Sequence, residues 1–363
     1  MQTLSPAQSG CLLLADITGY TKYLEATELE HAEDVLADLL ETLVATLQPV
    51  FTLSKLEGDA CFAYAEAGRV NPTLILDTVE SGYFAFRKRL RDIEHATSCD
   101  CNACVLIPSL DLKYFVHNGR YVARAIAGSE ELTGSDVVLV HRLLKGDAGS
   151  VVDNPAYAVY TRTTLDEFGM DAVILGFIPF TEDLQDVGEV AVAVEDLTRR
   201  WQLENERKRV YVTEHEADYT MTFPLPIPIE IAWDYMTDPR KRATWDAEIT
   251  SVEPQTPGRT GAGSVNHCMH GPEVVVEHVA DWRPFSYYTT EYPLTHLGAG
   301  EVWRHTYEFV ETDTGPVLMI RTKTLGSAAV EWFEANREGF EKRFETNRAA
   351  LLSLWEQESA LGA

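Results

Sequence analysis

The sequence predicts an α+β protein built from two domains. The chain has 363 residues, of which 45% are hydrophobic, and this is enough apolar material for more than one core. Apolar patterns of strand period and helix period alternate along it, which is typical of helices packed on a sheet. All seven tryptophans follow residue 200, so the two halves are not copies of one repeat. We expect domains at 8–200 and 210–358, joined by a linker at 201–209.

Composition excludes several classes of partner. The formal net charge is -27 at pH 7, so a nucleic-acid backbone or an anionic membrane surface would be repelled at long range. The first residues, MQTLSPAQSG, carry no basic segment of the kind that opens a signal peptide. No apolar stretch approaches the roughly 20 residues that a membrane span needs. We therefore expect a cytoplasmic protein with no membrane span and no nucleic-acid partner.

The first half reads as alternating strands and helices. A buried strand ends at Asp16, and a helix follows after a short turn. The next strand reaches Asp59, and the apolar residues after it form a further buried run. The segment VVLVHRLLKG either starts a helix or completes a strand. The expected elements are strands at 11–15, 60–64, 112–117 and 121–127 and helices at 21–47 and 76–93.

Two aspartates stand at the ends of apolar strands. We expect Asp16 and Asp59 each to close such a run, and neither carboxylate can be buried without a partner or a cation. If the two strands are neighbours, the carboxylates meet at one sheet edge. Together with the backbone carbonyl of Ile17 they are the hard oxygen ligands that Mg²⁺ or Mn²⁺ prefers. The alternative is that each aspartate only caps a turn or a helix.

The segments that hold these aspartates resemble a known family. ADITGYTKYL, followed by KLEGD, is similar to the catalytic domain of class III nucleotide cyclases, which has a ferredoxin-like α/β sandwich fold. The resemblance implies that Asp16, Ile17 and Asp59 bind two Mg²⁺ or Mn²⁺ ions together with a nucleoside triphosphate. It also implies that Lys55 reads the edge of the purine.

The resemblance extends into VHNGRYVARAIAGSEELTGSDVVLVHRLLKG. It implies that Glu131 is the acid that reads the base and that Arg142 neutralises charge in the transition state. One position departs from the family, because Val138 stands where an asparagine orients the ribose. The region is most similar to an uncharacterised bacterial subgroup of adenylate cyclase-related proteins, the DUF2652 type.

Two functions follow from this resemblance. The first is a nucleotide cyclase that forms cyclic AMP, or another cyclic nucleotide, and pyrophosphate at a homodimer interface, because the family's site forms between two such domains. The second is a catalytically inactive homologue that binds nucleotide or lipid as a sensor. Val138 favours the inactive homologue. Asp16, Asp59, Lys55 and Arg142 favour catalysis.

The segment HATSCDCNAC crowds three cysteines into six residues. Cys99, Cys101 and Cys104 have the chemistry to occupy three corners of a tetrahedral zinc site, and His95 is the candidate fourth ligand. Reduced free thiols in a loop are the alternative.

The second half resembles the START-like, or Bet v 1-like, SRPBCC family, which includes polyketide cyclase-type proteins. The resemblance rests on a strand, a proline-rich entry into a helix, Asp238-Pro239, and later strands closed by a long amphipathic helix. It implies a helix-grip fold with a cavity for a hydrophobic small molecule. The expected strands are 217–223, 263–269, 273–280, 287–292, 301–311 and 317–324, and the expected helices are 229–235 and 328–358.

Aromatic and histidine side chains are the candidates for lining this cavity. We also expect His267 and His270 to share one face of their strand, where they bind a metal or a polar ligand head or simply face solvent. Aromatic residues at strand spacing serve equally well as plain core. The candidate lining residues are Trp245, His267, His270, Tyr288, Trp303 and Phe340.

The cysteine spacing gives a prediction that metal analysis can check. Protein purified without chelator should carry close to one zinc per chain, and the double substitution Cys101→Ser with Cys104→Ser should remove it, because two of the thiolate ligands are lost. The unsubstituted protein should be measured in parallel. Finding no zinc in it would leave the free-thiol alternative.

Overall fold

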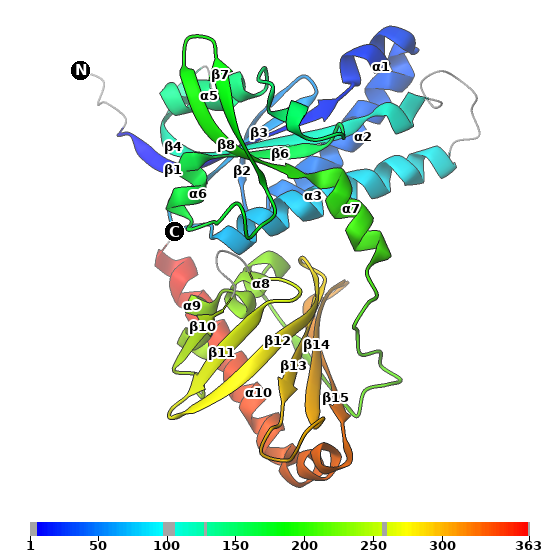
Figure 1. Ribbon diagram of the computed structural model, residues 1–363, viewed down its shortest axis with the longest axis vertical. Helices are drawn as coiled ribbons and strands as arrows, with labels where there is room; N and C mark the ends of the chain where they lie inside the picture. Colours follow the sequence, from blue (N-terminus) through cyan, green and yellow to red (C-terminus); the bar gives the residue numbers. More distant parts are fainter. Residues whose placement is uncertain (1–5, 97–105, 127–128, 256–259, 362–363) are drawn as a thin grey trace. The chain divides into compact units, whose positions relative to one another are not determined.

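The computed structural model describes residues 6–96, 106–126, 129–255 and 260–361 (Figure 1). The chain divides into two compact units, residues 1–207 and 208–363. Each unit has its own sheet, and the α+β class predicted from the sequence is confirmed. Among the described helices, none combines the length and the apolar character needed to cross a membrane.

The first unit begins with a ferredoxin-like arrangement. Strands β2, β3, β1 and β4 lie in that order, and each neighbouring pair is antiparallel. With helices after β1 and after β3, this is the β-α-β-β-α-β order of a ferredoxin-like fold, the fold that the resemblance implies. The elements are β1 (Gln8–Thr18), α1 (Tyr20–Ala26), α2 (Leu29–Leu47), β2 (Thr52–Glu57), β3 (Ala60–Glu66), α3 (Pro72–Ala96) and β4 (Asp111–Ile126).

Further elements extend this sheet beyond β4. Strand β6 pairs with β4 in parallel, and β8 and β7 follow in antiparallel pairing. These three strands are not predicted from the sequence. The additional elements are β5 (Ser129–Thr133), α5 (Ser135–Leu143), β6 (Tyr157–Thr161), α6 (Arg162–Glu167), β7 (Ile178–Leu184), β8 (Gly188–Asp196) and α7 (Leu197–Glu206), with short 3₁₀ turns at Ile107–Ser109 and Ala148–Val151.

Several expected boundaries change in the first unit. The strand expected at 11–15 does not end at Asp16 but continues to Thr18, because its pairing with β4 extends that far. The single helix expected at 21–47 is two helices, α1 and α2. The two strands expected at 112–117 and 121–127 are one long strand, β4, whose Gly119 continues the pairing with β1. The segment VVLVHRLLKG, for which helix and strand were both open, forms most of helix α5 and its C-terminal turn.

The core of the first unit lies on both faces of β1. Residues 11–15 of this strand are almost fully buried. Leu12 and Leu14 pack in a cluster with Val137 and Val140 of α5, while α2 and α3 pack on each other and on β3 and β4. A strand covered on both faces is apolar at every position, and this explains its unbroken run of hydrophobic residues.

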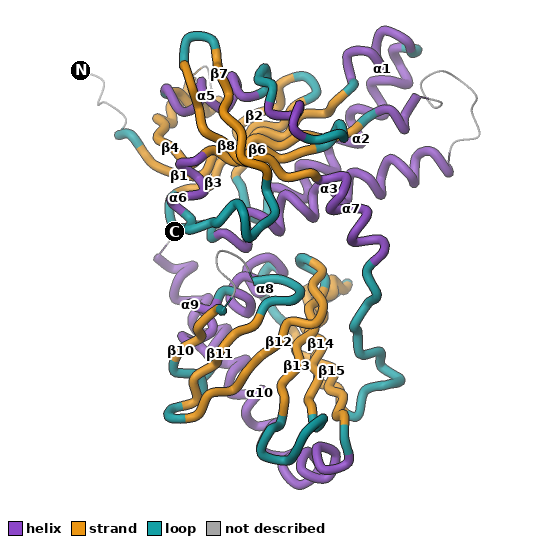
Figure 2. The backbone as a smooth tube through the Cα atoms, viewed as in Figure 1, coloured by secondary structure: helices purple, strands orange, loops and turns teal. Residues whose placement is uncertain are grey.

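The second unit is one antiparallel sheet and a long helix. Its strands follow the order β10-β11-β12-β13-β14-β15-β9, so the first strand pairs with the last. Helix α10 runs along the sheet (Figures 1 and 2), as the helix-grip prediction requires. The elements are β9 (Tyr219–Pro224), α8 (Ile229–Thr237), α9 (Pro239–Trp245), β10 (Ser251–Pro254), β11 (Val265–His270), β12 (Glu273–Arg283), β13 (Tyr287–Pro293), β14 (Val302–Thr312), β15 (Gly315–Leu325) and α10 (Ser327–Leu361).

Aromatic packing fixes one end of this sheet. Trp233 of α8 is fully buried and makes edge contacts with Trp282, Tyr288 and Phe309, at ring-centroid distances of 4.8, 5.6 and 5.5 Å. Large rings that meet edge to face fill volume without leaving voids. Towards α10 the same sheet encloses a cavity.

Candidate functional site

Asp16 and Asp59 lie at the same end of two paired strands. In the β1–β3 ladder Asp16 is opposite Ala60, the residue that follows Asp59. The Ile17 N–H donates to the Asp59 carbonyl oxygen at 3.1 Å, so the backbones at these positions are tied together. The expected adjacency of the two strands is therefore present.

The position of Asp59 differs from the expectation in one respect. Asp59 does not end an apolar strand, because it lies in the turn between β2 and β3, after Gly58 in the left-handed conformation (φ 67°). The apolar strand follows it. A tight turn of this type favours glycine at the left-handed position, and this accounts for the Gly-Asp pair.

The electrostatics of this pair point to a need for positive charge. Burial and, to a smaller extent, the Asp59 carboxylate raise the pKa of the Asp16 carboxyl to about 6, against the opposing effect of Lys113. Lys113 lies directly across from Asp16 in the β1–β4 ladder. Sequence reasoning missed Lys113, because the pairing of β1 with β4 is not visible in either strand alone. Two acids with one lysine nearby form a site that a cation would stabilise.

Lys55 and Glu131 are brought together from β2 and β5. The Lys55 Nζ lies 3.3 Å from a Glu131 carboxylate oxygen and 2.9 Å from a Glu57 carboxylate oxygen. The Glu57 hydrogen bond raises the pKa of Lys55, burial opposes that rise, and Glu131 adds to it. All three side chains are about one-third exposed. A donor and an acceptor side by side can read a polar molecular edge.

Two neighbours of Lys55 were missed from the sequence. Glu57 follows Lys55 by two positions, so strand alternation puts both side chains on one face, and this signal was available. The His141 Nε2 lies 3.0 Å from a Glu57 carboxylate oxygen, and its Nδ1 lies 2.7 Å from the Val137 carbonyl oxygen. Glu57 therefore connects Lys55 to helix α5.

Arg142 and Val138 lie on helix α5. An Arg142 Nη lies 3.5 Å from a carboxylate oxygen of Asp186, which is in the turn between β7 and β8. Within the described part of the chain, Arg142 forms no ion pair with Asp16, Asp59 or Glu131. Val138 is 53% exposed. Its isopropyl group places an apolar side chain on the exposed face of α5.

The candidate zinc ligands are not covered by the structure. Cys99, Cys101 and Cys104 lie outside the described residues, and so does the side chain of His95, which is near the end of α3. Among the residues that are described, no group of three or more His, Cys, Asp or Glu side chains is placed to hold a metal ion.

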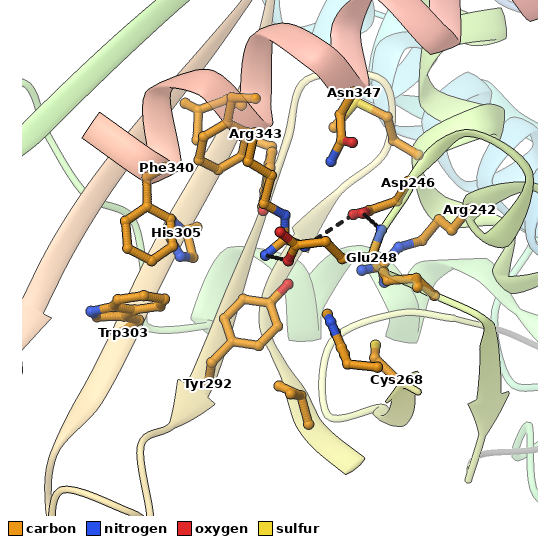
Figure 3. Close-up of a pocket in the computed structure, with 18 of the residues that line it drawn as sticks. Arg242, Asp246, Glu248, Cys268, Tyr292, Trp303, His305, Phe340, Arg343 and Asn347 are labelled. Atoms are coloured by element: carbon orange, nitrogen blue, oxygen red, sulfur yellow. Dashed lines mark hydrogen bonds and ion pairs between the residues drawn. The ribbon is translucent and has the colours of Figure 1, made fainter. Parts of the chain in front are cut away.

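The second unit contains a cavity of about 1300 Å³ (Figure 3). This is larger than the roughly 300–1,000 Å³ of common small-molecule sites. Five of the candidate residues line it: Trp245, His270, Tyr288, Trp303 and Phe340. The expectation for His267 is wrong, because residues three apart point to opposite faces of a strand, and it is Cys268 and His270 of β11 that line the cavity.

The cavity has two chemically different ends. At one end Trp303 and Phe340 meet edge to face, with ring centroids 4.5 Å apart (Figure 3). At the other end lie Arg242, Asp246 and Arg343, which sequence reasoning missed. In the sequence these residues are isolated charges that belong to no motif. The ion pairs of Arg242 with Glu277 and of Arg343 with Asp246 join segments that are far apart in the chain.

Both arginines are held by acids. The Arg242 Nη1 donates to Glu277 at 2.7 Å, and Glu277 also accepts from Asn266 at 2.8 Å and from the Tyr292 hydroxyl. Burial acts to raise the pKa of Glu277, but Arg242 and these hydrogen bonds outweigh it, so the pKa lies below its usual value. Arg343 of α10 pairs with Asp246 at 3.2 Å and with Glu248 at 2.9 Å.

Comparison with family models matches two regions in order. Residues 36–153 match a protein family of unknown function, DUF2652. Residues 216–353 match the family described as polyketide cyclase / dehydrase and lipid transport. The two matches, in this order, confirm the resemblance of the first half to the DUF2652 type and of the second half to the SRPBCC family.

Solved structures give likenesses of low sequence identity. The adenylyl cyclase CyaB from P. aeruginosa is 13% identical, with a TM-score of 0.41 over 53% of this chain and 97% of that one. The guanylyl cyclase Cya2 is 16% identical, with a TM-score of 0.42 over 53% of this chain and 93% of that one.

A curated relative gives a firmer assignment. An uncharacterised protein of Mycobacterium tuberculosis, Rv2561/Rv2562, is 32% identical over 165 residues, which are 45% of this chain and 73% of that protein. The chain therefore belongs to the family of this mycobacterial protein, with a DUF2652 region followed by a polyketide cyclase-type SRPBCC region.

Proposed function

We propose that the first unit is a class III-type nucleotide cyclase domain that converts a nucleoside triphosphate to a cyclic nucleotide and pyrophosphate. The observation that carries the proposal is the Asp16–Asp59 pair, tied together by the Ile17 hydrogen bond and with the pKa of Asp16 raised to about 6. The motifs that resemble the cyclases place their two metal acids at these positions. In the reaction the ribose 3′-oxygen bonds to the α-phosphorus as pyrophosphate leaves.

The residues present fit a divalent metal site. Two carboxylates and the Ile17 carbonyl are hard oxygen donors, and the negative charge at Asp16 is only partly offset by Lys113. When bound, Mg²⁺ or Mn²⁺ would supply positive charge at the reacting phosphate and lower the pKa of the attacking hydroxyl. Asp16 and Asp59 hold and orient that charge.

The remaining residues have separate tasks in this proposal. Lys55 donates to an acceptor on the base and Glu131 accepts from a donor. The pair of Arg142 with Asp186 is exposed, 38% and 70%, and surface pairs of this kind contribute only ~0–1 kcal/mol. Arg142 is therefore free to turn to a phosphate. One chain has a single domain of this type, so the proposed site needs a second copy in a homodimer.

A second candidate function is supported by other observations. Val138 offers no hydrogen bond to a ribose, and Lys55 is already engaged by two acids. A homologue that binds nucleotide without turnover would keep the metal acids Asp16 and Asp59. It would lose the side-chain contacts that orient the ribose and the base. In both cases we propose that the second unit binds a hydrophobic small molecule, and the cavity and the family match support this role.

The substitution Asp59→Ala should abolish binding of a triphosphate with Mn²⁺, because one of two metal ligands is lost. Calorimetric titration with each nucleoside triphosphate, together with mass spectrometry of the products, measures binding and turnover. Glu66→Ala, an exposed acid at the far end of the same strand, is the matched control. An unchanged affinity in Asp59→Ala would remove the proposed site.

Binding of the metal and nucleotide should weaken as the pH falls through about 6, since the proton on Asp16 competes with the metal. Asp16→Asn should bind more weakly and lose this pH dependence. The same raised pKa means that the folded unit loses stability as the pH rises from 3.8, the ordinary value, through about 6. Affinity measured from pH 5 to 8 tests the first point. A flat profile in the unsubstituted protein would contradict it.

If the protein turns over nucleotide, Val138→Asn should raise the rate by roughly tenfold, which corresponds to about 1.4 kcal/mol. The amide would orient the ribose, while Lys55 and Glu131 already hold the base. Product formation with Mn²⁺ is the measurement, and Arg142→Ala sets the background. A lower rate in Val138→Asn would show that this family orients the ribose differently. Bound nucleotide without turnover in any variant would favour the binding-only function.

A further inference from the structure

We propose that the cavity of the second unit selects an uncharged amphiphile, whose apolar body packs on aromatic rings and whose head is a hydroxyl or carbonyl group. This rests on the proposed role of the second unit as a binder of hydrophobic small molecules and adds the charge and head-group chemistry of the ligand. Three observations carry it: the balance of buried charge, a free buried amide, and the aromatic wall.

The buried charges at the polar end cancel. Arg242 faces Glu277, with side chains 13% and 2% exposed. Arg343 faces Asp246, with side chains 26% and 9% exposed. Glu248, the second partner of Arg343, is 54% exposed and is therefore solvated. The polar end of the cavity thus holds two cations and two anions in pairs. Arg348 and Glu273 also line the cavity, but Arg348 donates to the Pro224 carbonyl oxygen at a more exposed place and Glu273 is exposed to solvent.

The histidines on the inner wall add no charge at neutral pH. Burial lowers the pKa of His305 to about 4, and its Nδ1 lies 2.8 Å from the Thr322 hydroxyl. Burial and the nearby Arg343 lower the pKa of His270, against Asp246 and Glu248, which raise it. Both rings are neutral in the folded unit at pH 7.

A charged head would therefore enter without a counter-charge. An ion buried without a partner is strongly disfavoured, and taking Arg242 or Arg343 as a partner would leave a buried carboxylate unpaired. A neutral head avoids both costs. The charge balance thus excludes carboxylates and amines as preferred heads.

One neutral polar group is available to meet such a head. Asn347 of α10 is 5% exposed and lines the cavity, and its side chain points towards the charged end (Figure 3). Within the described part of the chain its amide has no hydrogen-bond partner. A buried amide without a partner costs free energy, and a ligand hydroxyl or carbonyl would satisfy it.

The opposite wall suits the body of the ligand. Trp303 and Phe340 meet edge to face, and Tyr288 stacks on Tyr307 with ring centroids 4.7 Å apart. Rings locked against one another present rigid, flat surfaces to the cavity. Flat apolar ligands match such surfaces with little loss of side-chain freedom.

Pyrene derivatives with three heads test the charge selection. Full-length protein is titrated at pH 7 with 1-pyrenemethanol, 1-pyrenecarboxylate and 1-pyrenemethylammonium, and binding is followed by pyrene fluorescence anisotropy. The alcohol should bind at least tenfold more tightly than either ion. Equal or tighter binding of an ion overturns the inference.

Substitutions separate the head-group contact from the charge balance. Asn347→Leu should weaken 1-pyrenemethanol and leave unsubstituted pyrene unchanged, whereas Gln357→Leu, an exposed residue on the same helix that does not line the cavity, should change neither. Glu277→Gln should shift the preference towards the carboxylate. Asp246→Asn tests the same shift if Glu277→Gln does not fold. An unaffected alcohol affinity in Asn347→Leu overturns the assigned contact.

The outcomes also distinguish this inference from the role on which it rests. If unsubstituted pyrene does not bind, the proposed hydrophobic-ligand role fails and the inference fails with it. If pyrene binds but the carboxylate is preferred, the role stands and only the inference is overturned.

Discussion

Burial of β1 on both faces is the constraint on which the first unit depends. Helix α5 packs on one face of the sheet and α2 and α3 on the other, so residues 11–15 have no polar position available. The first charged side chain of the strand is therefore Asp16, which directly follows this buried run. Antiparallel pairing with β3 then sets Asp16 beside the turn that carries Asp59. The position of the proposed site follows from the packing of the core.

The two units treat buried charge in opposite ways. In the first, burial and the Asp59 carboxylate raise the pKa of Asp16, and Lys113 offsets the rise in part. In the second, each buried arginine has a buried acid, and the site is internally neutral. A site with excess negative charge favours a ligand that brings positive charge. A site whose charges are already paired favours an uncharged ligand. This difference favours a metal-bound triphosphate in one unit and a neutral molecule in the other.

Elements with strong local patterns were predictable from the sequence, and long-range pairs were not. The run before Asp16 and the long helix α10 have periodicities that define them without tertiary context. Strands β7 and β8 were missed, because β7 has exposed positions along much of its length and β8 opens with exposed residues and a glycine turn. Lys113 and Glu277 gain their roles only through strand pairing and burial, which no short motif encodes. The expectation that His267 and His270 share a strand face was wrong, because residues three apart on a strand point to opposite faces.

The pairing of β9 with β15 has a consequence for how the second unit forms. Pro224 is opposite Val317, so the β9 edge of the sheet forms only when segments more than ninety residues apart in the chain meet. Contacts of such long sequence separation form late in folding. The chain loses conformational entropy when the loop closes, before the contact contributes any stabilising free energy. During synthesis the first unit has its complete sequence before β15 and α10 are made. The unit with the cavity is therefore completed after the first, and until β15 and α10 are added, its aromatic residues are open to chaperones and to aggregation.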